Sequence, residues 1–152
     1  MRVLIAEDES IIRLGLKSML QELGHDVIVA KDGHDALGQA RRHHPELAIL
    51  DIKMPGMDGI ELAQHIRNSA RHADTPILML TAMSDKRYID AAFAAGATDY
   101  VTKPFEIAEL KARIGLVEGM VKERQQRTKK IFAAKTIADQ ATHMELFEPV
   151  PI

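Results

Sequence analysis

Five strand-sized runs, separated by longer helical patterns, restrict the fold of this chain more than any other feature of its sequence. The runs are Val3–Ala6, Val27–Ala30, Leu47–Leu50, Ile77–Leu80 and Asp99–Thr102. None of them alternates regularly between polar and apolar residues, which is typical of strands buried on both faces of a parallel sheet. After each run, apolar residues recur at helical spacing, in the segments that contain Leu14, Ala36, Leu62, Ala92 and Ile114.

This strand–helix repetition predicts an α/β fold in which right-handed crossovers place helices on both faces of the sheet. Five such units suit a doubly wound five-stranded parallel sheet, whereas a barrel of this type needs eight. We expect the flavodoxin-like strand order 2-1-3-4-5, in which strands 1, 3, 4 and 5 end at one shared edge. Functional residues are therefore expected directly after those strands.

Polar residues do follow these four strands: Glu7 and Asp8, then Asp51, Thr81 and Lys103. Carboxylates a few ångströms apart repel one another, so such a cluster requires a cation or a raised pKa. Mg²⁺ is suited to this set because it binds one or two carboxylates, water and a phosphate group. Asp51 is then a candidate nucleophile toward a phosphoryl group, whose oxygens Lys103 and Thr81 would neutralise and hydrogen-bond.

Four ordered motifs carry a family resemblance: residues 3–9 (VLIAEDE), 50–59 (LDIKMPGMDG), 80–82 (LTA) and 96–105 (GATDYVTKPF). Over about residues 1–120 the chain resembles the receiver domain of bacterial two-component response regulators. The resemblance implies a protein that is phosphorylated by a sensor histidine kinase or a histidine phosphotransfer protein. It also implies signalling through the face formed by the fourth helix, the fifth strand and the fifth helix.

The resemblance assigns a role to each residue of the metal and phosphoryl site. Asp51 matches the phosphoacceptor, and Asp8 matches a direct Mg²⁺ ligand. Glu7 matches the second acid, which acts through metal-bound water, and the backbone carbonyl of Lys53 would complete the metal site. A competing interpretation is that the acids after the first strand only assist the start of the next helix.

Three residues on the last two strands match the remaining family positions. Lys103 matches the lysine that pairs with the phosphoryl group, Thr81 the switch hydroxyl, and Tyr100 the aromatic side chain that turns inward behind it. A cis Lys103–Pro104 bond would aim the lysine inward, as it does in the family, although trans is the commoner state for an arbitrary X–Pro pair. For Tyr100, half-buried packing is compatible with the switch role.

Two side chains near the site predict slow loss of the phosphoryl group. Lys53 lies two residues after Asp51, and Met83 lies two residues after Thr81. Neither side chain activates water well, so we expect slow self-dephosphorylation.

The sequence leaves three alternatives to a separate receiver protein. A Mg²⁺-dependent phosphatase with an aspartyl nucleophile usually has a second Asp two residues after the nucleophile, where this chain has Lys53. A flavodoxin-like cofactor protein needs a phosphate-binding loop after the first strand, where this chain has acids. The chain is also compatible with the receiver portion of a longer regulator.

We divide the chain into a receiver domain, residues 1–121, and a helical extension and tail, residues 122–152. The extension is too short for an independent output domain. It begins with the polar, net-positive stretch Lys122–Lys130 and continues with apolar residues such as Phe132 and Ile137. We expect a homodimer that forms either through the fifth helix or through this extension. The other interpretation of the extension is a solvated helix.

Composition sets the remaining expectations. The absence of cysteine excludes disulfides, thiolate zinc sites and a thiol nucleophile. A net charge of −2 gives no global basic field for nucleic acid. No signal peptide or membrane span is recognisable, so we expect a cytoplasmic protein. The family resemblance implies no enzymatic turnover beyond the protein's own phosphorylation and dephosphorylation. The seven histidines show no metal-ligand spacing, and we expect them to be solvated.

Overall fold

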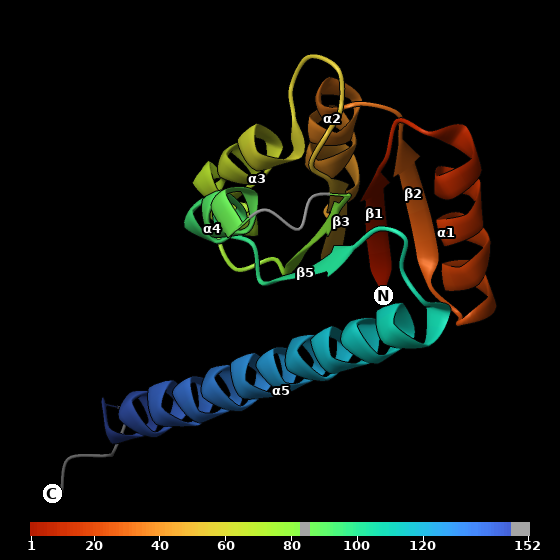
Figure 1. Ribbon diagram of the computed structural model, residues 1–152. Helices are drawn as coiled ribbons and strands as arrows, with labels where there is room; N and C mark the ends of the chain where they lie inside the picture. The colour runs from red at the N-terminus through yellow and green to blue at the C-terminus, as the bar shows by residue number, and fades with distance from the viewer. Residues whose placement is uncertain (83–85, 147–152) are drawn as a thin grey trace, which may run out of the picture. The chain divides into compact units, whose positions relative to one another are not determined.

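The sheet has five parallel strands in the order β2-β1-β3-β4-β5, as the sequence predicts. The computed structural model describes residues 1–82 and 86–146, with side chains described as far as residue 141. The strands are β1 (Arg2–Ala6), β2 (Asp26–Ala30), β3 (Leu47–Asp51), β4 (Ile77–Thr81) and β5 (Asp99–Thr102) (Figure 1). Every described neighbour pair in the sheet is parallel, which requires a helical crossover between successive strands.

The helical elements are α1 (Ser10–Glu22), α2 (Gly33–His43), α3 (Gly59–Asn68), the short 3₁₀ helix η1 (Ala70–His72), α4 (Lys86–Ala94) and α5 (Ile107–Leu146). Within the sheet domain, α2 packs against α3, and α3 packs against α4. The chain divides into two compact units, Met1–Ile114 and Gly115–Ile152. The first unit contains the whole sheet, and the described part of the second is the continuation of α5. No helix among the described residues has the length and apolar content of a membrane span.

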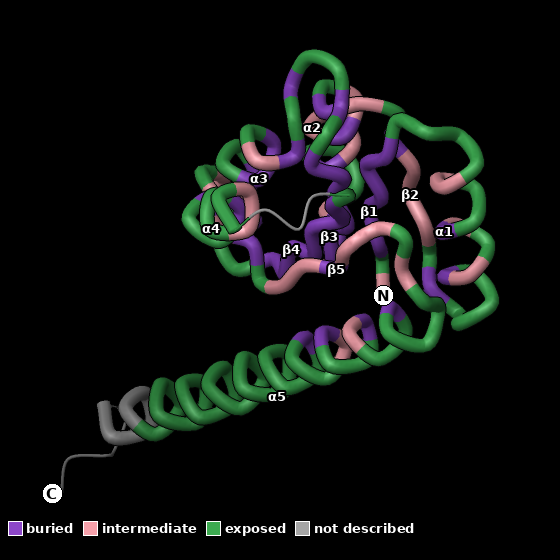
Figure 2. The backbone as a smooth tube through the Cα atoms, in the orientation of Figure 1, coloured by how far each residue is buried: buried purple, intermediate pink, exposed green. Residues whose placement is uncertain are grey.

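The central strands form the core. Every residue of β3 and β4 is buried, which explains why their sequences lack polar alternation. The tube in Figure 2 shows β1, β3 and β4 as buried along most of their length, whereas β2 at one edge is only partly covered. Loss of water contact by these aliphatic side chains is the main stabilising contribution to this unit.

Local signals fix the beginnings of two helices. Asp32 caps α2 by accepting a hydrogen bond from the Asp35 N–H, and Asp58 caps α3 by accepting one from the Glu61 N–H, both at 2.8 Å. A capping carboxylate satisfies a backbone donor that has no partner within the helix. The capped N-terminus of α3 directs the loop after β3 back over the end of the sheet.

The expectation that all the histidines are solvated is wrong for His25 and His72, which are 7% and 5% exposed. The His72 ring stacks on His44, with ring centroids 5.8 Å apart. His72 is buried because it lies in η1, a single turn that folds the chain after α3 inward. Its three residues have no periodic apolar pattern from which the turn could be predicted.

Candidate functional site

Three carboxylates meet at the carboxyl ends of β1 and β3. Glu7 and Asp8 follow β1 directly, and Asp51 is the last residue of β3. One carboxylate oxygen from each of them lies within 4.8 Å of those of the other two. Glu7 is fully buried and Asp51 is 4% exposed, whereas Asp8 is open to solvent. The strand order thus brings together residues that lie more than 40 positions apart in the sequence.

Lys103 supplies the positive charge of this cluster. Its Nζ lies 2.8 Å from Oε2 of Glu7 and 3.3 Å from Oδ1 of Asp51. Lys103 follows β5, and its peptide bond to Pro104 is cis. Its backbone N–H donates a hydrogen bond to the Thr81 carbonyl at 2.6 Å, which ties this loop to the end of β4.

The electrostatics of the cluster favour a proton on Asp51. Burial and the negative charge of Glu7 raise the pKa of the Asp51 carboxyl to about 7, even though Lys103 opposes the shift. Burial disfavours the charge of Lys103, but its hydrogen bond to Glu7 and the charge of Asp51 prevail and raise the pKa of its ammonium group. Lys103 therefore stays charged at neutral pH, whereas Asp51 is poised between its two forms.

The loop after β3 is held tightly against Asp51. The Gly59 N–H donates to the Ile52 carbonyl at 2.8 Å. A Cβ atom at position 59 would overlap the carbonyl group of Asp51. Glycine is therefore required here for the close approach of two backbone segments. Lys53 lies in the same loop with an exposed side chain.

The two residues predicted to switch lie on adjacent strands. Thr81 ends β4 and is 1% exposed. Tyr100 on β5 is half-buried, and its ring meets the edge of Phe93 from α4, with centroids 5.9 Å apart. Met83, which enters the prediction of slow dephosphorylation, lies outside the described residues.

One residue near the site escaped the sequence prediction. The Arg13 guanidinium on α1 donates to the backbone carbonyl of Glu7 at 2.8 Å and to that of Asp8 at 3.3 Å. These bonds hold the strand–helix turn that carries both acids. No sequence motif indicates these hydrogen bonds, because they join a side chain to backbone oxygens, which every residue type possesses.

The donor set suits a hard divalent cation. Three carboxylates face a single ammonium group in the described cluster, so negative charge is in excess. Mg²⁺ in proteins binds through oxygen ligands, typically one or two carboxylates together with waters and a phosphate group. Such an ion would relieve the repulsion that raises the pKa of Asp51.

Comparison with known families agrees with this geometry. The response regulator receiver domain family matches residues 3–115 of the chain. The chain belongs to this family. The matched residues include the β-sheet from Val3 onward and every residue of the cluster described above, from Glu7 to Lys103.

Relatives and solved structures match the same region. The chain is 43% identical over 123 residues to the transcriptional regulatory protein PdtaR of Mycobacterium tuberculosis, covering 80% of this chain and 58% of that protein. The chemotaxis protein CheY4 of Vibrio cholerae has a TM-score of 0.74 at 34% identity, covering 76% of this chain and 97% of that one.

A second similar structure is described with magnesium. The receiver domain of the sensor histidine kinase PA1611 of Pseudomonas aeruginosa has a TM-score of 0.71 at 28% identity, covering 80% of this chain and 97% of that one. That structure is described with a magnesium ion coordinated in its active site cleft. The present chain spans about half the length of the curated relatives that it matches.

Proposed function

We propose that this protein is a phosphorylation-dependent response regulator and that Asp51 accepts the phosphoryl group. The donor is a sensor histidine kinase or a histidine phosphotransfer protein. The observation that carries the proposal is the placement of Asp51, a nearly buried carboxyl with Lys103 at 3.3 Å and the oxygens of Glu7 and Asp8 close by. A merely structural ion pair would need neither the second nor the third carboxylate.

The chemistry follows from this placement. A carboxylate oxygen of Asp51 forms a bond to phosphorus while the bond from phosphorus to the donor's imidazole nitrogen breaks. The donor leaves with that electron pair, and Asp51 becomes an acyl phosphate. Lys103, which keeps its charge, is placed to neutralise a phosphoryl oxygen without moving far from Glu7.

Asp8, Asp51 and the backbone carbonyl of Lys53 are the proposed Mg²⁺ ligands. Glu7 is assigned to contact through metal-bound water, which agrees with its hydrogen bond to Lys103. When bound, the ion would supply positive charge to the phosphoryl oxygens. The carboxylate excess supports this assignment, as does the magnesium described for the PA1611 receiver domain.

Thr81 and Tyr100 are the proposed switch. Phosphorylation of Asp51 favours one of two arrangements in which these residues differ, and the change is presented on the face of α4, β5 and the start of α5. Partner binding or dimerisation then transmits the signal in the cytoplasm. PdtaR is named as a transcriptional regulatory protein. We therefore expect the signalling pathway to act on nucleic acid, whereas the sheet domain itself does not bind it.

The decisive experiment is intact-mass analysis after incubation with Mg²⁺ and acetyl phosphate. The parent should gain the mass of one phosphoryl group, and the Asp51→Asn variant should gain none. A second comparison without Mg²⁺ should show much slower labelling. An adduct of equal yield in Asp51→Asn would overturn the assignment of the phosphoacceptor.

Membership of the receiver family disfavours the phosphatase alternative. Lys53 also occupies the position at which such phosphatases place a second acid. A steady release of phosphate from p-nitrophenyl phosphate, beyond one equivalent per chain, would be required to restore that alternative.

A further inference from the structure

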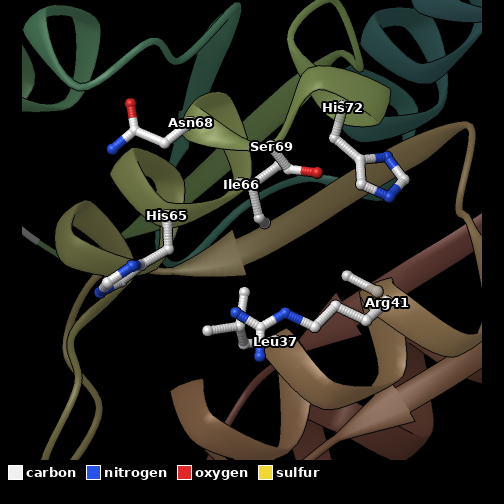
Figure 3. Close-up of a pocket in the computed structure, with 8 residues that line it drawn as sticks. Leu37, Arg41, His65, Ile66, Asn68, Ser69 and His72 are labelled. Atoms are coloured by element: carbon white, nitrogen blue, oxygen red, sulfur yellow. The ribbon is translucent and has the colours of Figure 1, made fainter.

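A cavity of about 280 Å³ lies between α2 and α3, and it is separate from the phosphoryl site. Figure 3 shows its lining, to which α2 contributes Leu37 and Arg41 and α3 contributes His65 and Ile66. Part of the wall is apolar, whereas the groups at its borders are hydrogen-bond donors. A cavity lined in this way binds small molecules that have an apolar body and one polar group.

His72 provides a buried polar atom without a partner. The residue is 5% exposed, and its Nδ1 lies 3.1 Å from the Thr75 hydroxyl oxygen. Its Nε2 has no partner within hydrogen-bond geometry. Burial is the main influence and lowers the pKa of the ring despite the neighbouring Ala40 carbonyl, so the ring is neutral at pH 7. An unsatisfied buried nitrogen is costly unless something binds to it.

Arg41 provides an uncommitted cation. No ion pair formed by the described residues includes it. Its side chain extends along the cavity toward Leu37 (Figure 3). The neighbouring Arg42 differs, because its guanidinium hydrogen-bonds back to the Gly38 carbonyl and does not line the cavity.

Charge and size select the ligand class. Arg41 is the one lysine or arginine among the described residues that line the cavity, so the lining itself balances one negative charge, not two. The planar fork of arginine matches a carboxylate in a bidentate geometry. The apolar wall of Leu37, Ala40 and Ile66 suits a compact hydrocarbon or aromatic body. The Ser69 hydroxyl at the border offers a further donor.

We propose that the cavity between α2 and α3 binds a small monocarboxylate, with Arg41 on the carboxylate and the apolar body against Leu37 and Ile66. This site lies outside the phosphorylation chemistry, so it would give the receiver domain a second, small-molecule input. The phosphoryl site and the cavity are joined by α3, which begins beside Asp51 and ends at the cavity.

The test is a titration of the full chain followed through backbone amide chemical shifts. Benzoate is the probe, benzamide is the neutral analogue, and phenyl phosphate is the dianionic analogue. Saturable shifts should be confined to amides around Arg41, Ile66 and Ser69, with benzoate binding at least tenfold more tightly than benzamide. Arg41→Gln should weaken benzoate binding at least tenfold, and Arg42→Gln should leave it unchanged.

Arg41 is exposed, so its replacement should not disturb folding. The Asp51→Asn variant should bind benzoate as the parent does, which separates this cavity from the phosphoryl site. Equal binding of benzamide would show an apolar cavity without carboxylate recognition and would overturn the proposal. Equal weakening by Arg41→Gln and Arg42→Gln, tighter binding of phenyl phosphate, or absence of saturable shifts would also overturn it.

Discussion

At the scale of single residues, three interactions compete for Asp51. Glu7 raises the pKa of its carboxyl, Lys103 lowers it, and a cation bound by the same acids would lower it further. Lys103 pairs with both acids, and its Nζ is closer to Glu7 than to Asp51. A cation held by these acids would therefore compete with the proton on Asp51.

This competition predicts how stability depends on pH without metal. The folded-state pKa of Asp51, about 7, exceeds the ordinary value of 3.8. The folded protein then binds more protons than the unfolded chain between those values, and its stability falls as pH rises through that window. Asp51→Asn should remove this fall and raise the free energy of unfolding at pH 8 by roughly 2–4 kcal/mol.

Urea denaturation in EDTA, at pH 5 and pH 8, measures both effects. Lys103 keeps its bond to Glu7 in the variant, so its own charge is retained. Mg²⁺ should stabilise the parent at pH 8 and stabilise Asp51→Asn much less. If the free energy of unfolding depends on pH in the same way in the parent and in the variant, Asp51 does not carry a raised pKa.

We expect Lys53 to affect a different quantity, the lifetime of the phosphorylated state. Its exposed ammonium lies two residues after Asp51, where it cannot orient water as a base. Lys53→Asn should lose the phosphoryl group several-fold faster, because a neutral amide can hydrogen-bond an attacking water. Phosphoryl decay followed by intact mass after removal of the donor checks this, and an unchanged decay rate would contradict it.

The acids and Lys103 were predictable because parallel strands end at one edge, so residues just after different strands must converge. Arg13 and His72 were not predictable. Arg13 acts on backbone carbonyls, and His72 is buried by a 3₁₀ turn that leaves no periodic signal. Prediction from the sequence thus succeeds where the strand topology alone brings side chains together. It fails where a contact is made to backbone atoms or where an irregular turn buries a side chain.

At the scale of elements, α3 links distant parts of the fold. Its N-terminus begins beside Asp51, and Arg67 in its last turn donates to the backbone carbonyls of Gly96, His72 and Thr75. A single guanidinium thus joins the loop before β4 to the loop before β5.

Arg67→Ala should destabilise the protein by about 2–4 kcal/mol, because it leaves several carbonyls without their charged donor. Arg67→Lys is the matched control, since it keeps the charge but lacks the planar fork. The lysine variant should recover less than half of the loss in urea denaturation. Full recovery by lysine would show that charge, and not the shared hydrogen bonds, stabilises this junction.

The predicted strands agree with the observed ones to within one residue at each end. The prediction placed Asp51 and Thr81 just after their strands, whereas each is the last residue of its strand. The ladder continues past the apolar run because the Ile52 N–H donates to the Leu80 carbonyl. Backbone hydrogen bonds extend a strand regardless of side-chain polarity, so an apolar pattern underestimates its length.

At the scale of the whole molecule, the continuation of α5 exposes several large apolar side chains. Ile131, Phe132 and Ile137 are each about two-thirds exposed or more. Surrounding charges in this segment form pairs such as Arg127 with Glu123. A helix with charged residues and several exposed apolar side chains gains by association with a second helix.

Residues 122–152 should therefore promote self-association. Light scattering after size-exclusion chromatography should show a larger species for residues 1–152 than for residues 1–121 at the same concentration. The double variant Ile131→Glu with Phe132→Glu, at full length, should behave as the shorter chain does. Monomers in all three samples, with and without acetyl phosphate, would rule out this role.

The missing Cβ of Gly59 also bears on how this protein can change over generations. Any substitution at this position introduces a Cβ atom that collides with the Asp51 backbone rather than with a movable group. Gly59 can therefore be replaced only if the loop after Asp51 changes its conformation at the same time. Lys53 lies only two residues after Asp51, yet its side chain is exposed, so its replacement meets no such collision.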